Sequence, residues 1–214
     1  MYEEIKRGMI RAGKDMDSYG LIALSGGNIS VRVDKDKILI TPSGMIYEFM
    51  NEEDLILMDL EGNILEGIRK PSVDTDAILY IYNNMTKVNS VIHTHQPYAT
   101  ALGLVLNKIP CNLTTLANAT KGEVNVAPYS SAADIDMGIK TVENIGDSLA
   151  VVLKHHGVVA VGDSLKQAMY SAVYLEEAAK TLAIAYSISN DLPMMTEEQV
   201  NEAVKVFDRY GQSK

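Results

Sequence analysis

The sequence predicts a single-domain α/β protein, organised as a three-layer sandwich with helices flanking a mostly antiparallel or mixed central sheet. Segments with the 3.6-residue spacing of helices alternate along the chain with short apolar or alternating segments that are typical of strands. Several strand segments come in pairs joined by short polar turns, which indicates hairpins and antiparallel pairing. No repeat, linker or low-complexity tract interrupts the 214 residues, so we expect one domain over residues 1–214.

The N-terminal part of the chain predicts a helix followed by two hairpins. Apolar side chains recur every three or four residues over Tyr2–Tyr19, and Gly20 ends this helix. The hairpin strands are expected at Ile29–Val33 with Ile38–Ile40, and at Leu55–Leu60 with Asn63–Leu65.

The remaining elements alternate between helices and strands. They are a helix opening near Asp74 and reaching Met85, a strand at Asn89–His95, a helix at Tyr98–Leu106, an extended segment at Ile109–Cys111, a strand at Val124–Tyr129 and a helix at Ile135–Ile145. Two apolar strands follow, at Leu149–Leu153 and Gly157–Val161. Asp163 or Ser164 caps a long helix to about Ser187, and a capping box at Thr196–Gln199 opens a last helix that ends near Tyr210.

Composition narrows the functional classes. The hydrophobic content of 47% and charged content of 22% are ordinary for a globular protein. A formal charge of −9 argues against a nucleic-acid backbone or an anionic membrane as the main partner. The single cysteine, Cys111, excludes an internal disulfide framework. Residues 1–7 are charged where a signal peptide is apolar, and no apolar run approaches about 18 residues, so we expect a cytoplasmic protein.

The four histidines fall in two clusters, each at the end of a predicted strand: His93 with His95, and His155 with His156. Side chains alternate along a strand, so His93 and His95 are expected to point the same way. A catalytic zinc usually takes three protein ligands and keeps one position open. Histidines that merely end strands and bond to the backbone are the alternative, but the clustering favours a metal site made by His93, His95 and one of the later pair.

Turns rich in glycine and hydroxyl groups indicate an anion site. Gly26-Gly27-Asn28 allows a sharp turn that exposes backbone N–H groups, and Thr41–Gly44 adds hydroxyl groups. Taken alone, each is also an ordinary tight turn. Ser72 and Asp74 stand at a helix start, where an N-cap is the common role. The histidine strand that follows favours a second role, with both side chains pointing toward the histidines.

Five motifs in this order give the chain a resemblance to the class II aldolase family, which includes L-fuculose-1-phosphate aldolases and L-ribulose-5-phosphate 4-epimerases. The resemblance runs from about Tyr2 to Gly211. The motifs are Gly26–Ser30, Thr41–Gly44, Lys70–Asp74, His93–His95 and His156-Gly157. Any one of them is common, whereas all five in register are specific for the family.

The resemblance implies a Zn²⁺, or another divalent transition metal, held by His93, His95 and His156, with His155 as a neighbour. Asp74 falls on the family's acidic residue, which acts as the catalytic base and occasionally as a fourth metal ligand. Family members are typically homotetramers whose site lies at a subunit interface. There a tyrosine from the neighbour's C-terminal segment completes the site, and Tyr210 matches that tyrosine.

The resemblance also places the substrate phosphate, and the residues implied are Gly27, Asn28, Ser43, Gly44, Ser72 and, at the position of a second family serine, Val73. Four further positions depart from the family patterns. Asp74 stands where the aldolases usually have Glu and the epimerases have Asp. Thr114 and Ala132 stand at aromatic positions of the aldolases, which predicts a wider and more polar aldehyde pocket. The lysine of the epimerases falls on Thr41.

The implied function is a zinc-dependent aldolase that cleaves a ketose 1-phosphate of the L-fuculose 1-phosphate type to dihydroxyacetone phosphate and a short aldehyde. The first alternative is 4-epimerisation of a pentulose 5-phosphate, as in L-ribulose-5-phosphate 4-epimerase. The second is a non-catalytic interaction module like the adducin head domain, which would be expected to lack metal ligands. In each enzyme hypothesis the partner is a small sugar phosphate.

Overall fold

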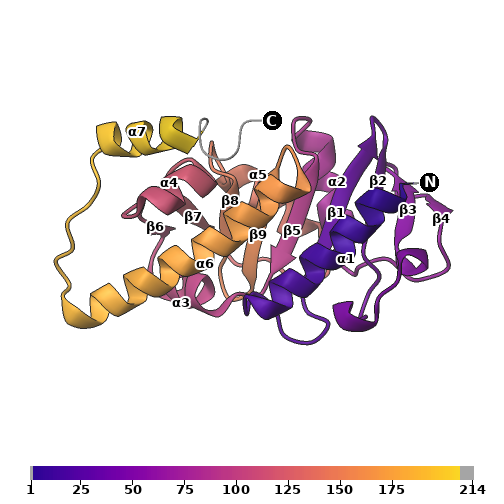
Figure 1. The fold of residues 1–214 in the computed structure, drawn as a ribbon, viewed down its shortest axis with the longest axis horizontal. Coiled ribbons are helices and arrows are strands. Elements are labelled where there is room, and N and C mark those ends of the chain that lie inside the picture. Colours follow the sequence, from indigo (N-terminus) through magenta and orange to yellow (C-terminus); the bar gives the residue numbers. More distant parts are fainter. Residues whose placement is uncertain (1, 208–214) are drawn as a thin grey trace.

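Nine strands form one open sheet in the computed structural model, which describes residues 2–207 (Figure 1). The strands are β1 (Asn28–Asp34), β2 (Lys37–Ile40), β3 (Ile56–Asp59), β4 (Ile64–Glu66), β5 (Ser90–Thr94), β6 (Lys108–Ile109), β7 (Val124–Ala127), β8 (Ala150–Leu153) and β9 (Gly157–Gly162). Their order is β4-β3-β2-β1-β5-β9-β8-β7-β6. Among these described strands only β7 and β8 run parallel, so the predicted α/β fold with a mixed, mostly antiparallel sheet is confirmed.

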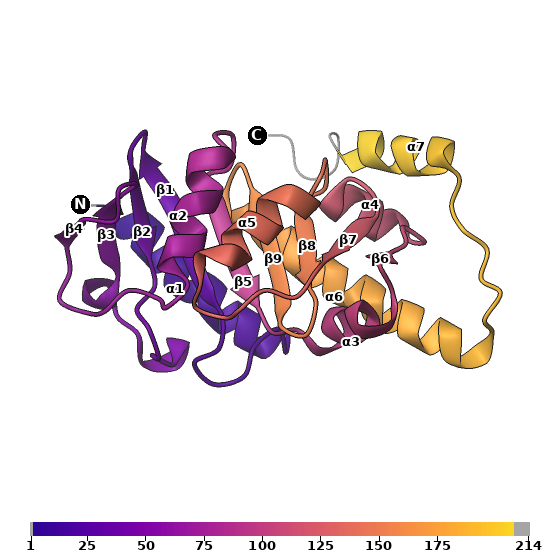
Figure 2. The same ribbon diagram turned by 180° about the vertical axis from the view of Figure 1, so that it is seen from behind.

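Helices cover both faces of the sheet. The described α-helices are α1 (Glu3–Ser18), α2 (Thr75–Asn84), α3 (Pro97–Val105), α4 (Thr114–Thr120), α5 (Ile135–Asn144), α6 (Leu165–Ile188) and α7 (Glu197–Phe207), of which α7 packs on α4. Helices α1 and α6 lie in front of the strands in Figure 1, and α2 and α5 lie in front of them in Figure 2. Helix α3 packs Ala99 and Leu102 into the same hydrophobic cluster as α1 and α6. Among residues 2–207, none of the helices combines the length and the apolar composition that crossing a lipid bilayer requires.

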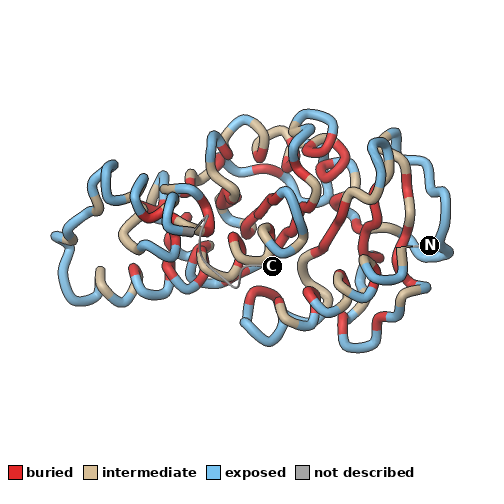
Figure 3. The backbone as a smooth tube through the Cα atoms, turned by 45° about the horizontal axis from the view of Figure 1, so that its top comes forward, coloured by how far each residue is buried: buried red, intermediate tan, exposed pale blue. Residues whose placement is uncertain are grey.

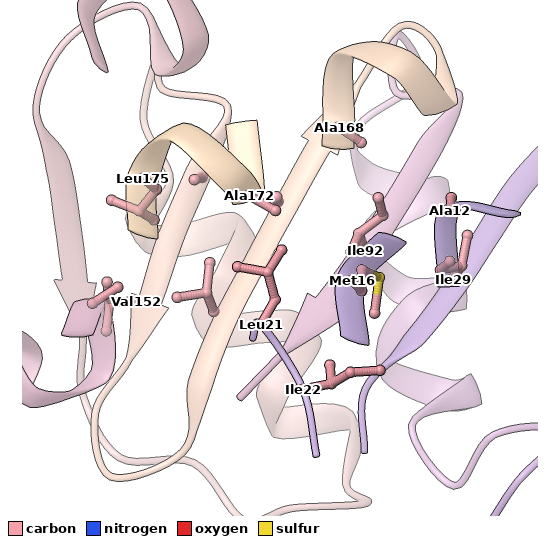
Figure 4. Close-up of a cluster of buried hydrophobic side chains, with 14 of the residues drawn as sticks. Ala12, Met16, Leu21, Ile22, Ile29, Ile92, Val152, Ala168, Ala172 and Leu175 are labelled. Carbon is pink, nitrogen blue, oxygen red and sulfur yellow. The ribbon is translucent and has the colours of Figure 1, made fainter. Parts of the chain in front are cut away.

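Two hydrophobic clusters fill the space on either side of the sheet. Ile92 of β5 packs with Met16 of α1 and Ala172 of α6 in the first cluster, part of which is shown in Figure 4. Val91 belongs to the second cluster, under α2 and α5. Because side chains alternate along a strand, His93 lies on the same face as Val91, toward α2.

The predicted helix starts are confirmed by their caps. The Ser164 hydroxyl accepts a hydrogen bond from the N–H of Gln167 at 3.3 Å. At α7, the Thr196 hydroxyl accepts from the N–H of Gln199, and the Gln199 side chain accepts from the N–H of Thr196, at 3.2 and 2.9 Å. These reciprocal bonds form the expected capping box.

Helix α4 is the one α-helix among the described residues that the sequence pattern does not predict. Its seven residues include three threonines and an asparagine, residue types with low helix propensity. Leu116 and Ala117 are buried, so packing of the helix on the core stabilises it in place of local preference. The two short 3₁₀ turns at Tyr47–Phe49 and Glu52–Asp54 also lie outside the predicted elements.

Burial is greatest in the middle of the sheet, as Figure 3 shows by the red central segments. Every residue of β5 and of β9 is buried, including the polar residues Ser90, His93 and Thr94. Histidine and threonine side chains are costly to bury without hydrogen-bond partners. The polar side chains at the end of β5 are therefore expected to have hydrogen-bond partners.

Candidate metal centre

The candidate site lies where the ends of three adjacent central strands meet. Strand β5 pairs antiparallel with β1 on one side and with β9 on the other, with Asn28 opposite His93 and Thr94 opposite Val158. The start of β1, the end of β5 and the start of β9 therefore lie side by side. His156 immediately precedes β9, so the topology brings it to His93 and His95 from more than sixty residues along the chain.

The three histidines converge closely enough to share one ion. One ring nitrogen of each of His93, His95 and His156 lies within 4.8 Å of the corresponding atoms of the other two. The ring centroids are 4.7 to 5.3 Å apart. His155 is exposed, has a φ of +64° and packs its ring against Tyr129 instead. The geometry thus selects His156 from the later pair, as the resemblance implies.

His93 is held in the tautomer that leaves its Nε2 able to bind a metal. Its Nδ1 lies 2.9 Å from the carbonyl oxygen of Val158. A carbonyl only accepts hydrogen bonds, so Nδ1 carries the proton and donates it. Burial, followed by the neighbouring His156 and His95, lowers the pKa of His93 to about 3, so the ring is neutral at pH 7. The lone pair is consequently on Nε2, as in metal-bound histidines oriented by a backbone carbonyl.

The other two histidines share this neutral state. Burial lowers the pKa of His95, and burial together with the neighbouring His95 lowers that of His156, while the charge of Asp74 opposes both shifts. The Nε2 atoms of His93 and His95 lie 3.0 Å apart. Two nitrogens bound to one tetrahedral zinc at 2.0–2.1 Å would lie roughly 3.3 Å apart. The Nδ1 of His156 is buried and has no hydrogen-bond partner within residues 2–207. This donor set fits Zn²⁺ or a similar divalent metal.

Asp74 stands at the N-cap position of α2, but its side chain makes no capping bond to that helix. Its Oδ2 accepts a hydrogen bond from Nδ2 of Asn28 at 2.8 Å, and its Oδ1 accepts from the N–H of Ala133 at 3.3 Å. Asp74 is 7% exposed. The simple cap interpretation is therefore wrong for Asp74, whose carboxylate is held across the start of β1, on the side of His95 and His156.

Ala133 is a residue of this site that the sequence does not reveal. It has a φ of +58° and offers its backbone N–H, not its side chain, to Asp74. A non-glycine residue in the left-handed region is uncommon, but nothing in the residue type of alanine signals it. No sequence pattern identifies such a donor.

The predicted anion-site segments are joined to one another by backbone hydrogen bonds. The N–H of Ser43 donates to the carbonyl of Lys70 at 2.9 Å, and the N–H of Ser72 donates to the carbonyl of Thr41 at 3.2 Å. Because these two N–H groups are already used, the hydroxyl groups of Ser43 and Ser72 are the donors that the serines retain. The Ser72 hydroxyl oxygen accepts from the N–H of Asp74 at 3.2 Å, so its own proton is free to be donated.

The glycines and Val73 complete the description of this region. Gly27 has a φ of +73°, and a Cβ there would lie 2.5 Å from the carbonyl oxygen of His93, so only glycine fits. Gly44 has a φ of +71° and open space around it. Val73 is 63% exposed and offers no donor to an anion. Tyr210 lies outside the described residues.

Comparisons with known proteins agree with this arrangement. The sequence matches the model of one protein family, described as Class II Aldolase and Adducin N-terminal domain, over residues 7–210. It is 31% identical over 205 residues to a 5-deoxy-D-ribulose 1-phosphate aldolase of Bacillus thuringiensis serovar kurstaki, covering 95% of each chain. It is 36% identical over 166 residues to an L-fuculose phosphate aldolase of Methanococcus maripaludis, covering 78% of this chain and 87% of the other. The fold superposes on a solved L-fuculose 1-phosphate aldolase with a TM-score of 0.89 and 28% identity, covering 96% of each chain.

Proposed function

The chain belongs to the family of class II aldolases and adducin N-terminal domains, and we propose that it is a zinc-dependent aldolase cleaving a ketose 1-phosphate of the L-fuculose 1-phosphate type. The products would be dihydroxyacetone phosphate and a short aldehyde. The observation that carries the proposal is the convergence of three neutral imidazoles beside a buried carboxylate. Both curated relatives described above are named as aldolases of sugar phosphates.

His93, His95 and His156 would hold the metal, with Asp74 as an occasional fourth ligand. When bound, the metal supplies Lewis-acid stabilisation of the negative charge that develops on the substrate's carbonyl oxygen. The Val158 carbonyl fixes the ring of His93 before any ligand arrives, so little reorganisation accompanies binding.

Asp74 is the base of the proposed reaction. In the condensation direction its carboxylate takes the proton from the carbon next to the carbonyl of dihydroxyacetone phosphate, and that carbon then bonds to the aldehyde carbon. Asn28 and the N–H of Ala133 orient the carboxylate by a hydrogen bond to each oxygen. General base catalysis of this kind typically contributes about 10²- to 10⁴-fold to the rate. Cleavage runs the same steps in reverse.

The substrate phosphate is proposed to lie among Gly27, Asn28, Ser43, Gly44 and Ser72. The serine hydroxyls retain protons to donate, and the N-terminus of the ten-residue helix α2 begins just after this region. A helix N-terminus favours an anion through its backbone N–H groups and its dipole. Local donors of this kind are needed because the chain as a whole carries a formal charge of −9.

Tyr210 of a neighbouring subunit is proposed to donate the proton to the aldehyde oxygen, within a homotetramer. Mixing two inactive variants tests this sharing. Tyr210→Phe and His156→Ala subunits, each inactive alone, should regain activity when they exchange within one assembly, because some sites then receive an intact histidine set and an intact tyrosine. Sedimentation velocity reports the assembly size. A monomer, or no recovery in verified mixed assemblies, would exclude a shared site.

A second enzymatic candidate is 4-epimerisation of a pentulose 5-phosphate. Asp74 favours it, since the epimerases have Asp where the aldolases usually have Glu. The non-catalytic interaction module is less well supported, because the three histidines are all present and converge.

The decisive experiment offers zinc-reconstituted protein a panel of ketose 1-phosphates and L-ribulose 5-phosphate. Dihydroxyacetone phosphate is detected through glycerol-3-phosphate dehydrogenase and NADH, and all products are identified by NMR. We expect cleavage of at least one ketose 1-phosphate, its loss in His156→Ala, and its retention in His155→Ala, the matched control beside the site. Epimer without dihydroxyacetone phosphate would favour the second candidate. A protein that binds no metal would indicate the interaction module.

A further inference from the structure

The residues on either side of the candidate ligand His95 are fastened to helix α6. The Thr94 hydroxyl donates to Oε1 of Gln96 at 2.7 Å, and Nε2 of Gln96 donates to the carbonyl oxygen of Ala172 at 3.3 Å. Thr94 and Gln96 are 1% and 0% exposed. Along this extended segment His93 and His95 face the metal centre, while Thr94 and Gln96 face α6.

One turn further along α6, Glu176 binds the start of the next helix. Its two carboxylate oxygens accept hydrogen bonds from the N–H groups of Tyr98 and Ala99, at 2.8 and 3.0 Å. These are among the first N–H groups of α3, which have no partner within their own helix. Glu176 is 5% exposed, and burial raises its pKa while the two backbone bonds oppose that shift.

This cap comes from a different helix, unlike the other side-chain caps found among the described residues. Helices α5 and α6 are capped locally, by the side chains of Asp134 and Ser164 at their own N-cap positions. The N-cap residue of α3 is Gln96, whose side chain makes no capping bond because it is turned to Thr94 and Ala172. A local cap stabilises a helix without fixing where the helix lies. A carboxylate supplied by α6 does both, since it fixes the start of α3 relative to α6.

We propose that Glu176 is a positioning residue of the metal centre, which acts by holding the segment Thr94–Ala99 against α6 and so fixes the backbone that carries His95. The metal itself rests on the proposed function above. Within residues 2–207, His95 has only one backbone hydrogen bond of its own, from its N–H to the carbonyl of Leu21 at 3.0 Å. Its ring must nevertheless keep Nε2 aimed at the shared ligand position, 3.0 Å from that of His93. The contacts through Gln96 and Glu176 supply the missing restraint on the C-terminal side of His95.

The test compares Glu176→Gln with Ser171→Ala. Glu176→Gln keeps the size of the side chain but turns one acceptor oxygen into a donor that faces a backbone N–H. Ser171→Ala removes a different buried hydrogen bond of α6, to the carbonyl of Ala119 at 2.7 Å, and does not touch residues 94–99. It is therefore a matched control for a purely structural loss. Glu176→Asp keeps the charge with a shorter reach and serves as the conservative variant, and as the test variant if Glu176→Gln does not fold.

Two readouts are measured on each variant. In metal-free protein, amide hydrogen exchange at His95, Tyr98 and Ala99 should be at least about 10-fold faster in Glu176→Gln and unchanged in Ser171→Ala. With Co²⁺ as the probe metal, Glu176→Gln should bind about 10-fold more weakly, the low end of the effect of groups that support ligands, and its visible absorption should change. Glu176→Asp should lie between Glu176→Gln and the unmodified protein in both readouts.

The proposal would be overturned if Glu176→Gln changed neither the amide hydrogen exchange at His95 nor the Co²⁺ spectrum. Glu176 would then be a helix cap only. A comparable change in Ser171→Ala would overturn it as well, because any loosening of α6 would then suffice. If the unmodified protein binds no Co²⁺, the proposed function fails, while the exchange rates in metal-free protein still decide the role of Glu176.

Discussion

The buried, neutral state of His93 predicts a specific loss of stability in mild acid. In the folded protein the pKa of His93 lies near 3, against an ordinary value of 6.5. Between these two values the unfolded chain binds a proton at this position and the folded chain does not. The unfolding free energy therefore falls as the pH falls from about 6.5 toward 3, and is unaffected by this group well above 6.5.

The size of the effect follows from the two pKa values. For a folded pKa near 3 and an unfolded pKa of 6.5, lowering the pH from 7 to 5 removes about 2 kcal/mol of unfolding free energy. His95 and His156 have lowered pKa values too, so they add loss of the same sign. Carboxylates also titrate toward the lower end of this range, so the contribution of His93 has to be isolated by a variant.

His93→Asn is that variant. The amide Nδ2 of asparagine can replace Nδ1 of histidine as the donor to the Val158 carbonyl, whereas the titrating ring is removed. Urea unfolding is followed by circular dichroism and tyrosine fluorescence, since the chain has 11 tyrosines and no tryptophan. Both proteins are kept metal-free and at one concentration, because metal and assembly shift apparent stability.

The prediction concerns the difference between the two pH profiles. Between pH 7 and pH 5 the unmodified protein should lose about 2 kcal/mol more unfolding free energy than His93→Asn. The absolute stability of the variant is not the readout, since the smaller side chain leaves a cavity. Parallel profiles for the two proteins would refute the argument that His93 is buried in its neutral form.

Three further outcomes test the site. Gly27→Ala should lower the free energy of unfolding in urea by about 2–4 kcal/mol, because a Cβ would lie 2.5 Å from the carbonyl oxygen of His93. The control Gly20→Ala, at a similar φ of +70° but with open space around it, should lower it by about 1 kcal/mol. Equal losses would contradict the close approach. Asp74→Asn should lower kcat about 10²- to 10⁴-fold with metal content unchanged by elemental analysis, and retained activity would exclude Asp74 as the base. Ser72→Ala should raise KM for the phosphorylated substrate about 10-fold or more in steady-state assays with little change in kcat, and an unchanged KM would place the phosphate elsewhere.

The sequence pattern predicts most helices and strands because their periodicity reports which face of each segment is buried. The hairpins β1–β2 and β3–β4 and the helices α1, α2, α3, α5 and α6 all follow such patterns. Helix α4 does not, since its residues have little helix preference and its formation depends on packing against α6 and α7. Local sequence carries no information about that packing.

The candidate site is predictable to the extent that it consists of side chains with distinctive chemistry. His93, His95 and His156 stand out because the chain has four histidines in two clusters, and the structure brings these three together. What periodicity does not reveal is the strand order that places β5 between β1 and β9. That order comes from long-range pairing, which the spacing of residues does not report. The family resemblance, in contrast, identifies His156 as the third histidine.

The contacts that hold the site cannot be predicted from the sequence either, because they also depend on long-range packing. Ala133 contributes a backbone N–H, and Glu176 lies within a long helix where a glutamate ordinarily indicates a solvent-facing position. Its neighbour Glu177 is indeed exposed, and nothing in the local sequence separates the two. Only the distance to the start of α3 shows that one of them is a buried anchor.

The end of strand β5 explains why one short segment can carry both chemistry and support. Alternation sends His93 and His95 to the face covered by α2, where Asp74 lies, and sends Thr94 and Gln96 to the face covered by α6. A metal site on a loop would need its own restraints, whereas here the candidate ligands His93 and His95 are each followed by a residue fixed on the opposite side of the same backbone. Side-chain alternation therefore does two things at once: it groups the candidate ligands His93 and His95 on one face, and it provides the positions from which α6 can hold them still. If that division is correct, substitutions on the α6 face should alter metal affinity without touching any ligand, whereas substitutions elsewhere on α6 should alter stability alone.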